Sequence, residues 1–563
     1  MDIFVSNLQT NSNFFSEAQN SIVFKNSFKK EHILLIVKGT IYNTKELQHK
    51  FNLPSDNINE LIISLYSQVG IEFLNYLNGS FSIVLYDIKQ KQLFCAVDRY
   101  GQNTLFYYIL NKSFIISSDI KNIIKTLPKI PSPNQASISQ YFQFFSPIEN
   151  NTIYSNIFKL QGSYYLQFDI DKKEYKYKKY HKQRVQKSIF NQDEAYSTIK
   201  DRLFNSLSTI YNSNHKLAFL LSGGVDSSLL CSIYTHISNK QIDTFSVAYK
   251  DYKRYDESSY AQIVSEHINS KHHKINITKE LFIENIDEVL DIFSVPFGDS
   301  ASISLNILNK QIKAYGFDSI LSGEGSDELF LGYNSYQKLL KFHNFSQSLS
   351  SPQLEFLNEI VPSVQNHTKE SEYLLRVAKK EFLYNSFGET YNNLQKHIIL
   401  KKAHFYSQKS LNSNFLDSLS LIDMNNWLYS VLLYKVDTLS SYYKLQAKMP
   451  FLDNNLVDAS FSIEPRLKLI NGDKSIIKEI AKEFLPQTII QRKKKGFSTP
   501  HNEWLFSYYK DKILDTILHT CKNSDFFKED GIKEIYTRAK NGKFKQHLWL
   551  LFIFSKWYNK IYL

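Results

Sequence analysis

The stretch "LAFLLSGGVDSSLL", residues 217 to 230, places two glycines, three serines and one aspartate between two apolar runs. The first run ends abruptly at Ser222, which is typical of a buried parallel strand, and the sequence from Leu229 onward predicts a helix. A strand, a Ser/Gly loop and a helix N-terminus in this order predict an anion site, because glycines let the backbone approach a ligand and free N–H groups point at it. The residues expected to donate to phosphate oxygens are Ser222, Gly223, Gly224, Ser227 and Ser228.

Asp226 lies inside this loop and cannot donate to phosphate, because it is itself an anion. We expect it to hold a Mg²⁺ ion that bridges phosphate oxygens, and this pairing suggests a nucleoside triphosphate. The loop lacks the lysine of a Walker loop, and a Gly-Gly pair after a strand often marks only a tight turn. The string SGGVDSS is more specific than such a turn. It resembles the pyrophosphate loop of the ATP pyrophosphatases, enzymes that split ATP into AMP and pyrophosphate.

A second loop, "DSILSGEGSDELFLGY" at residues 318 to 333, repeats the order of strand, Ser/Gly turn and acidic segment. Its carboxylates at Glu324, Asp327 and Glu328 repel one another unless a cation compensates them, although solvated loop charges are an alternative. Asp327 is the expected second Mg²⁺ ligand beside Asp226, and Glu324 is the expected general base. Ser322 and Gly323 are expected to contribute to the nucleotide site.

Composition and charge limit the class of protein. The chain has 563 residues and 43% hydrophobic residues, which fits two or three globular domains. The net charge of +12 comes from lysines spread along the whole chain, so we expect no nucleic-acid partner. Three separated cysteines predict a reducing, cytoplasmic location, and no secretory signal is expected at the N-terminus. The apolar run Leu548 to Phe554 is too short for membrane insertion and predicts a buried C-terminal helix.

The pattern of the chain changes between its two halves. Up to about Tyr180 there are short β-like segments separated by turn signals, which predict layered antiparallel sheets. From about Ile189, strands such as IDTFSVAY and DSILS alternate with helical patterns, which predicts a parallel sheet flanked by helices. Residues 342–436 are mostly helical in pattern and carry no recognised motif. We therefore predict two domains, residues 1–185 and 186–563, of mixed α/β and α+β class.

The chain resembles the class II asparagine synthetases and their relatives over nearly its whole length. The N-terminal half resembles them in KGTIYNTKEL, LNGSFSIVLYD and DRYGQNTLFYY. The C-terminal half does so in SGGVDSS, YDESSYA, SGEGSDELFLGY, MPFLDNNLVD, DKSIIKEIAKEFLP and RKKKGFSTP. The order and the spacing of these segments agree with the family.

This resemblance implies an N-terminal glutaminase-like domain of the Ntn-hydrolase type and a C-terminal synthetase domain of the adenine-nucleotide α-hydrolase type. The synthetase would use ATP and Mg²⁺ to convert a carboxylate into an acyl-AMP and then into an amide. Carried over from the family, residues 222–228 would bind pyrophosphate, and Asp226 and Asp327 would bind Mg²⁺. Glu324 would help deprotonate the amine, and Lys474 would stabilise charge at the reacting carbonyl and phosphate. A solvated lysine at a helix start is the alternative for Lys474.

The N-terminal half departs from the family where a glutaminase needs its catalytic groups. Glutamine-hydrolysing members have a cysteine nucleophile after the initiator methionine, whereas this chain has Asp2. Their NGEIYN segment is KGTIYN here, with Lys38 and Thr40 at the changed positions, and the glutamine-binding arginine is missing. Cys95 lies inside a strand-like segment and is expected in the core. We predict that this domain is inactive as a glutaminase and serves as a scaffold.

The amine is therefore expected from another source. Relatives with the same loss include the β-lactam synthetases and the lasso-peptide macrolactam synthetases, which use an amine of the substrate. The stretch before PFLD carries Thr438, Gln446 and Lys448, where aspartate-using members carry Arg, Glu and Arg, which predicts altered recognition of a small dicarboxylate. A specialised amide or macrolactam synthetase is the first hypothesis, with a small-molecule or peptide substrate and a precursor-peptide-processing protease as partner. An asparagine synthetase that uses free ammonia is the alternative, which the retained Glu324 favours.

Overall fold

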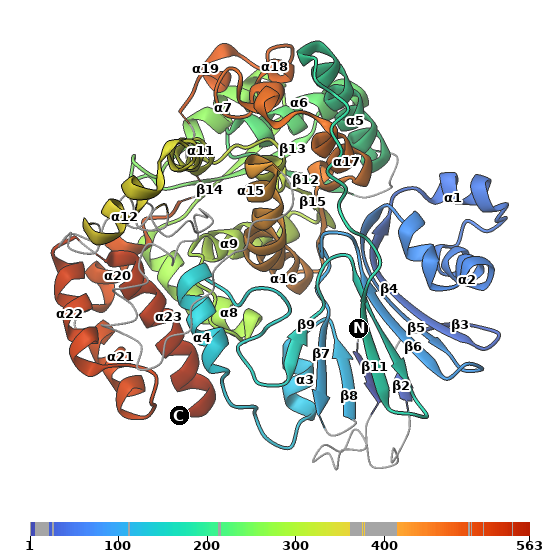
Figure 1. Ribbon diagram of the computed structural model, residues 1–563, viewed down its shortest axis with the longest axis horizontal. Helices are drawn as coiled ribbons and strands as arrows, with labels where there is room; N and C mark the ends of the chain where they lie inside the picture. Colours follow the sequence, from blue (N-terminus) through green and yellow to red (C-terminus); the bar gives the residue numbers. More distant parts are fainter. Residues whose placement is uncertain are drawn as a thin grey trace.

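Two antiparallel sheets form the N-terminal half of the protein in the computed structural model (Figure 1). The structure describes residues 2–5, 22–24, 27–110, 113–211, 216–360, 374, 377, 414–493, 496, 498–510, 512–542 and 544–563. The first sheet has the order β2 (Ile22–Phe24), β1 (Asp2–Val5), β8 (Ser113–Ser117), β7 (Phe106–Leu110) and β9 (Ile157–Lys159). The second has the order β11 (Glu174–Lys179), β10 (Tyr164–Asp169), β6 (Gln92–Val97), β5 (Gly79–Asp87), β4 (Ile33–Ile41) and β3 (Phe28–Lys30).

Side chains along β5 alternate between two buried clusters, and this alternation explains how the layers stack. Val84 faces a buried cluster shared with residues of the first sheet, such as Phe114 and Ile116. Its neighbours Ile83 and Leu85 face the opposite cluster, which the N-terminal helices cover. The strand is therefore buried on both faces, as the expectation of layered antiparallel sheets requires, and that expectation is confirmed. The helices of this half are α1 (Thr44–Phe51), α2 (Ile58–Val69), η1 (Gly70–Tyr76), α3 (Ile120–Thr126) and α4 (Gln135–Phe144).

A five-stranded parallel sheet forms the centre of the C-terminal half and confirms the second part of the expected fold class. Its order is β14 (Lys271–Asn276), β13 (Asp243–Ala248), β12 (Leu217–Leu220), β15 (Ser319–Leu321) and β16 (Gln446–Lys448). The chain first extends the sheet from β12 to one side and then returns to place β15 on its other side. In such sheets, ligands bind outside the carboxyl ends of the strands at the point where the direction reverses. That point lies between the two Ser/Gly loops, because one follows β12 and the other follows β15.

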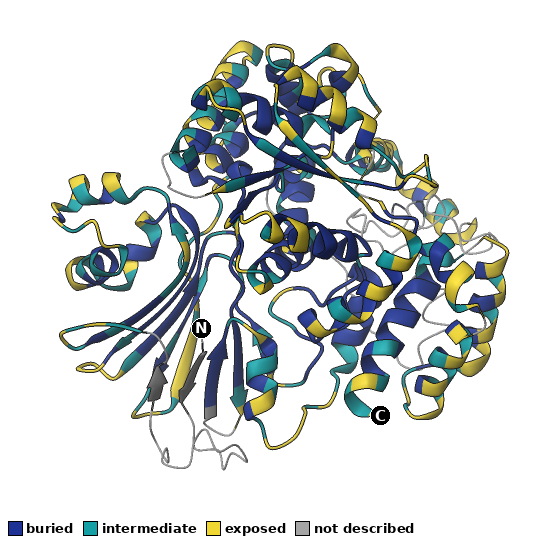
Figure 2. Ribbon diagram, turned by 180° about the vertical axis from the view of Figure 1, so that it is seen from behind, coloured by how far each residue is buried: buried dark blue, intermediate teal, exposed yellow. Residues whose placement is uncertain are grey.

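Helices surround this sheet, and buried residues gather in the strands and on the inner helix faces (Figure 2). Those before β16 are α5 (Gln192–Tyr211), α6 (Val225–Ser238), α7 (Ser258–His267), α8 (Lys279–Phe293), α9 (Ala301–Ala314), α10 (Ser326–Leu329), α11 (Asn334–Ser348), α12 (Ser351–Ile360), α15 (Phe415–Asp423), the π-helix η5 (Met424–Leu433) and α16 (Tyr434–Tyr442). Those after it are η6 (Pro450–Leu452), α17 (Asn454–Ser462), η7 (Pro465–Leu469), α18 (Ser475–Ala481), α19 (Gln487–Ile490), α20 (His501–Tyr509), α21 (Lys512–Lys522), α22 (Glu529–Lys540) and α23 (Lys545–Tyr562).

Several sequence expectations can be compared with these elements. The run Leu548–Phe554 lies in α23 and is buried, as expected. Cys95 is also buried, in β6. The expected helix start at Leu229 is wrong, because α6 begins at Val225. Gly224 caps the helix with extended backbone angles, so the polar residues 226–228 form its first turn.

The exposed strand β11 and the polar strand β14 were not expected, because neither carries an apolar pattern. Within residues 342–436 the described parts are helical, as predicted, but residues 361–413, except 374 and 377, lie outside the described residues. No helix in the described part of the chain has the length and apolar character needed to span a bilayer.

The two halves pack against each other through buried tyrosines. Tyr141 on α4 donates its hydroxyl to the carbonyl of Leu550 at 3.0 Å, and Tyr154 donates to the carbonyl of Ser294 at 2.6 Å. The last N-terminal strand ends at Lys179 and α5 begins at Gln192. The domain boundary placed after residue 185 falls in this connection and stays a prediction.

Candidate active site

The loop after β12 is held together by its own serines. The hydroxyl groups of Ser222 and Ser227 lie 2.9 Å apart, and the N–H of Gly224 donates to the Ser222 hydroxyl at 3.3 Å. Arg492 donates to the carbonyl of Gly223 at 2.7 Å and also pairs with Glu257. The loop is therefore preformed, and the basic cluster 492–495 contributes at least Arg492 to its outer side, while residues 494 and 495 lie outside the described residues.

Most of the residues predicted for the site line one cavity of about 630 Å³ at the carboxyl ends of β12 and β15. Ser228 is the clearest exception. Its side chain is fully buried, and its N–H donates back to the carbonyl of Gly224 within α6, so it does not reach the cavity. Gly223 also lies outside the lining and faces Ala261 and Tyr260 of α7. The predicted residues that line the cavity are Ser222, Gly224, Asp226, Ser227, Ser322, Gly323, Glu324, Asp327 and Lys474.

Lys474 connects the two loops. Its ammonium lies 2.5 Å from a carboxylate oxygen of Asp226 and 2.6 Å from one of Asp327. Ser326 adds a second link, because its hydroxyl donates to the other oxygen of Asp226 at 2.6 Å. A side chain at Gly332 would collide with both Asp327 and Lys474, which explains the glycine at this close approach. Residues distant in sequence thus meet in one charged cluster.

The two carboxylates of this cluster stabilise the positive charge of Lys474. Lys474 is 1% exposed, and burial alone would lower the pKa of its ammonium. The ion pairs with Asp226 and Asp327 outweigh this cost and hold the pKa above its ordinary value, so the lysine stays charged. A buried, permanently charged lysine between two carboxylates argues against the alternative of a solvated lysine at a helix start.

The same two carboxylates fit the expected Mg²⁺ ion. In the part of the chain that the structure describes, no group of three or more His, Cys, Asp or Glu side chains could hold a metal. Mg²⁺ commonly takes one or two carboxylates and completes its shell with water and substrate phosphate oxygens. Asp226 and Asp327 offer such a pair, and the metal assignment to these two residues stays a prediction.

Glu324, the expected general base, lines the same cavity. Burial is the main reason that the pKa of Glu324 lies above its usual range, while Lys435 opposes the shift and nearby carboxylates add to it. Lys435 forms a 2.7 Å ion pair with Asp299, and both residues line the cavity. Burial also raises the pKa of Glu328 to about 8, and the hydroxyl of Tyr333 donates to this carboxyl at 2.5 Å.

Asp299 and Lys435 also line the cavity, and they differ in how far a sequence pattern marks them. Lys435 interrupts the apolar helical run VLLYKV, and a charge in such a run is a usable signal of function. Asp299 follows no comparable pattern. Its role becomes visible only when the fold brings it to Lys435.

A second polar network supports α10 from behind. The hydroxyl of Ser420 donates to the carbonyl of Glu328 at 2.6 Å. The hydroxyl of Ser460 and the ammonium of Lys468 donate to the carbonyl of Leu329 at 3.0 and 2.8 Å. These donors satisfy carbonyls at the end of a four-residue helix that cannot pair them internally. They thereby fix the helix that carries Asp327.

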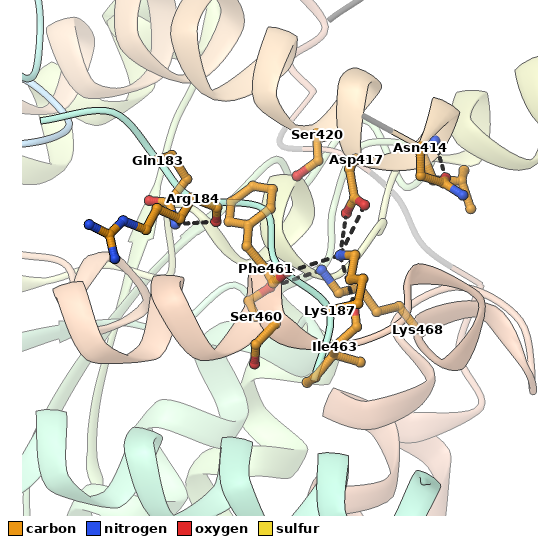
Figure 3. A network of polar contacts seen from close by, with 12 residues as sticks. Gln183, Arg184, Lys187, Asn414, Asp417, Ser420, Ser460, Phe461, Ile463 and Lys468 are labelled. Atoms are coloured by element: carbon orange, nitrogen blue, oxygen red, sulfur yellow. Dashed lines mark hydrogen bonds and ion pairs between the residues drawn. The ribbon is translucent and has the colours of Figure 1, made fainter. Parts of the chain in front are cut away.

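The donors of this network belong to elements far apart in the chain (Figure 3). Lys187, in the connection between the halves, pairs with Asp417 at 2.9 Å and donates to the carbonyls of Phe461 and Ile463. Burial lowers the pKa of Lys468 to about 7; Asp417 opposes this shift and Lys187 adds to it. The network joins the inter-domain connection to the back of the active-site cavity.

Similarity to known proteins agrees with this geometry. A family model for asparagine synthase matches residues 198–559, and one for a glutamine amidotransferase domain matches residues 25–181. The chain belongs to the asparagine synthase family. This membership makes it an ATP-dependent ligase that forms carbon–nitrogen bonds.

The individual relatives of this asparagine synthase family member share low sequence identity with it. A putative glutamine-hydrolysing asparagine synthetase 2 of Methanocaldococcus jannaschii is 29% identical over 324 residues, which are 56% of this chain and 62% of the relative. The glutamine-hydrolysing asparagine synthetase 1 of Bacillus subtilis is 24% identical and covers 95% of this chain and 86% of its own length. The amidase chry2 of Gibberella zeae is 21% identical and covers 86% of this chain and 79% of its own length.

The structure also changes the interpretation of the departures before PFLD. Gln446 and Lys448 do not line the cavity. Lys448 instead donates to the hydroxyl of Thr40 at 2.6 Å and to Gln446 at 3.1 Å, at the contact between the two halves. Thr438 is also absent from the lining. The expectation that these three residues alter recognition of a small dicarboxylate therefore has no support from their positions.

Proposed function

We propose that this protein adenylates a carboxylate with ATP and couples it to an amine that its own N-terminal domain does not supply. The cluster of Asp226, Lys474 and Asp327, placed where the Ser/Gly loops meet, is the observation that carries the proposal. Two acidic loops joined by a buried lysine suit the phosphates of a nucleotide with its counter-ion. Bound Mg²⁺ would neutralise phosphate charge and favour departure of pyrophosphate.

The chain's own groups then have separable tasks. Backbone N–H groups in the first turn of α6 would hold phosphate oxygens. Lys474 would stabilise the charge that develops as the substrate carboxylate attacks the α-phosphorus and pyrophosphate leaves. In the second step the amine attacks the acyl carbon and AMP departs. Glu324 would accept the proton that the amine loses, since it lines the same cavity and its raised pKa makes it a stronger base.

Two substrate classes remain as candidates within this proposal. A macrolactam or other specialised amide synthetase would need no glutaminase, in agreement with Asp2, Lys38 and Thr40 in the N-terminal half. Asparagine formation is supported by the named asparagine synthetases, although both are glutamine-hydrolysing, and the retained Glu324 favours a form that uses free ammonia. The altered residues Gln446 and Lys448 were the argument against this alternative, and they do not line the cavity.

Product analysis separates these candidates. The protein would be incubated with ATP, Mg²⁺, aspartate and ¹⁵N-ammonium, and in parallel with hydroxylamine and a panel of carboxylic acids and peptides. Labelled asparagine with equimolar AMP would establish the asparagine synthetase, whereas a hydroxamate of another acid would establish a specialised synthetase. Release of ADP instead of AMP would contradict the proposal. Asp226→Asn is the inactive control, and glutamine is expected not to replace ammonium.

A further inference from the structure

Phe145 brings the N-terminal half of the chain into the active-site cavity. It follows α4 directly and has φ of 70° and ψ of −10°, a left-handed conformation that is costly for an aromatic residue. Its carbonyl accepts a 2.9 Å hydrogen bond from the N–H of Gly298, which anchors it to the synthetase half. Although it is 6% exposed, its side chain contributes to the cavity lining. A strained residue held in such a place suggests a function beyond packing.

Trp427 contacts Phe145 in the lining of this cavity. The two rings meet edge to face with centroids 5.9 Å apart. Trp504, Trp549 and Trp557 are at most 2% exposed, whereas Trp427 is only partly buried and lines the cavity. It sits on the π-helix η5, and π-helical turns occur frequently at functional sites. Two neighbouring aromatic rings in the lining of a cavity offer a surface for apolar or aromatic groups.

Neighbouring residues link this aromatic pair to Glu324, the expected general base. Gly298, which bonds to Phe145, directly precedes Asp299, and Asp299 pairs with Lys435. Lys435 in turn acts electrostatically on Glu324. A group bound against the two rings would therefore belong to the amine that Glu324 would deprotonate or to the acyl chain beside it.

The charges of the lining agree with an uncharged occupant here. Among the lining residues that the structure describes, each lysine or arginine already pairs with a carboxylate: Lys435 with Asp299, Lys474 with Asp226 and Asp327, Lys478 with Asp473, and Arg492 with Glu257. An additional carboxylate of the substrate would have to compete with one of these pairs. An apolar group needs no such partner.

We propose that Phe145 and Trp427 form a subsite for an aromatic or comparably large apolar group of the substrate. The inference rests on the proposed ligase function and gives the N-terminal domain a direct part in substrate recognition. It favours substrates larger than aspartate, whose side chain offers no group for the two rings.

Binding measurements test the subsite without requiring turnover. Phenylacetate and acetate, and benzylamine and methylamine, are probe pairs that differ by a ring. Their binding would be measured by saturation-transfer NMR in the presence of ATP, which occupies the nucleotide side. We expect each ring-bearing probe to bind at least tenfold more tightly than its partner. Phe145→Asn and Trp427→Leu should each remove this preference while ATP affinity stays within twofold.

The variants are chosen to keep the protein folded. Asparagine tolerates the left-handed backbone of position 145 better than other residues do, so Phe145→Asn removes the ring without adding strain. Phe144→Leu, at a buried neighbour outside the lining, is the matched control and should keep the preference. Equal binding of the ring-bearing probes to wild type and both variants, or no preference in wild type, would overturn the subsite. If the preference is present but no carboxylate yields AMP, the subsite stands and the ligase proposal fails.

Discussion

At the scale of single residues, the site depends on a buried lysine held between two partly buried carboxylates. The carboxylates of Asp226 and Asp327 face each other across the ammonium of Lys474. The lysine alone would be costly to bury, and the two carboxylates offset this cost. The same arrangement places a fixed positive charge where pyrophosphate would leave. Stability and catalysis are therefore coupled at this position.

Lys474→Met tests that coupling. Without the ammonium, the two carboxylates repel each other and the developing phosphate charge is no longer stabilised. We expect pyrophosphate release to fall by about 10²-fold or more, as when one charge-stabilising donor is lost from an active site. Lys482→Met is the control, because Lys482 pairs with Glu479 near the surface. Equal rates for both variants, measured by a coupled pyrophosphate assay, would remove Lys474 from the mechanism.

Glu324→Gln separates the two chemical steps. The neutral amide of the variant could not accept the amine proton, so amide formation should be lost while ATP–pyrophosphate exchange continues. Because the pKa of Glu324 is raised, the basic form appears only as the pH rises through a value above the ordinary range of a glutamate. Amide formation by wild type should therefore increase with pH across that range. The rate of ATP–pyrophosphate exchange should not show this increase. Loss of exchange in the variant would assign Glu324 to adenylation.

The sequence predicted the charged residues of this site better than the apolar ones. Asp226, Asp327 and Lys474 stand in recognisable motifs, and the fold brings them together. Ser228 belongs to the same motif but points into the core, because the helix begins four residues earlier than expected. Phe145 carries no pattern of its own, since its position depends on a contact made across the two halves.

At the scale of elements, the short helix α10 has too few residues to satisfy its own carbonyls. Ser420, Ser460 and Lys468 supply the missing donors from α15, α17 and η7 (Figure 3). No local sequence pattern indicates these partners, because each comes from a different part of the chain. Strands and helices with clear periodicity were predictable, but the network that supports a four-residue helix was not.

Lys468→Met probes this network through its pH dependence. The pKa of Lys468 is lowered to about 7 in the folded protein, against an ordinary value of 10.5. Between these values the unfolded chain binds a proton that the folded chain lacks, so the free energy of unfolding of wild type rises with pH. Its difference from the variant, which lacks this group, should therefore grow in favour of wild type from pH 7 to 9.5.

Denaturant unfolding at several pH values measures that difference. Lys482→Met is again the control and should differ from wild type by less than about 0.5 kcal/mol at each pH, as expected for a surface substitution. A difference between Lys468→Met and wild type that stays constant with pH would show that Lys468 is not neutralised by its burial.

At the scale of the whole molecule, two departures from the family that look independent in sequence form one contact. Lys38 pairs with Asp437 at 2.8 Å, and Thr40 bonds to Lys448 and Gln446. The changed positions of the N-terminal half thus touch the changed positions before PFLD. Sequence reasoning assigned the first set to lost glutaminase chemistry and the second to substrate choice. The fold places them together as an inter-domain contact, which a single sequence cannot reveal.

Tyr429 forms another link between the halves, and it lies on the same π-helix as Trp427. Its hydroxyl donates to the carbonyl of Leu160 at 2.9 Å, and the ammonium of Lys159 lies 4.0 Å from its ring centroid. Gly101 makes room for this ring: a Cβ there would lie 2.6 Å from the ring of Tyr429, and its φ is +71°. The docking of the N-terminal half is thereby tied to the wall of the active-site cavity.

Gly101→Ala should disturb both the docking of the N-terminal half and the wall of the active-site cavity. The left-handed backbone and the collision with Tyr429 are expected to cost about 2–3 kcal/mol in the free energy of unfolding. Because the collision pushes on η5, the KM for the carboxylate substrate should rise while the KM for ATP changes little. Gly542→Ala is the matched control, since it has φ of +84° with no atom near its Cβ and should cost only about 1 kcal/mol. If Gly101→Ala lost no more stability than Gly542→Ala and kept its KM, the two halves would be energetically independent at this contact.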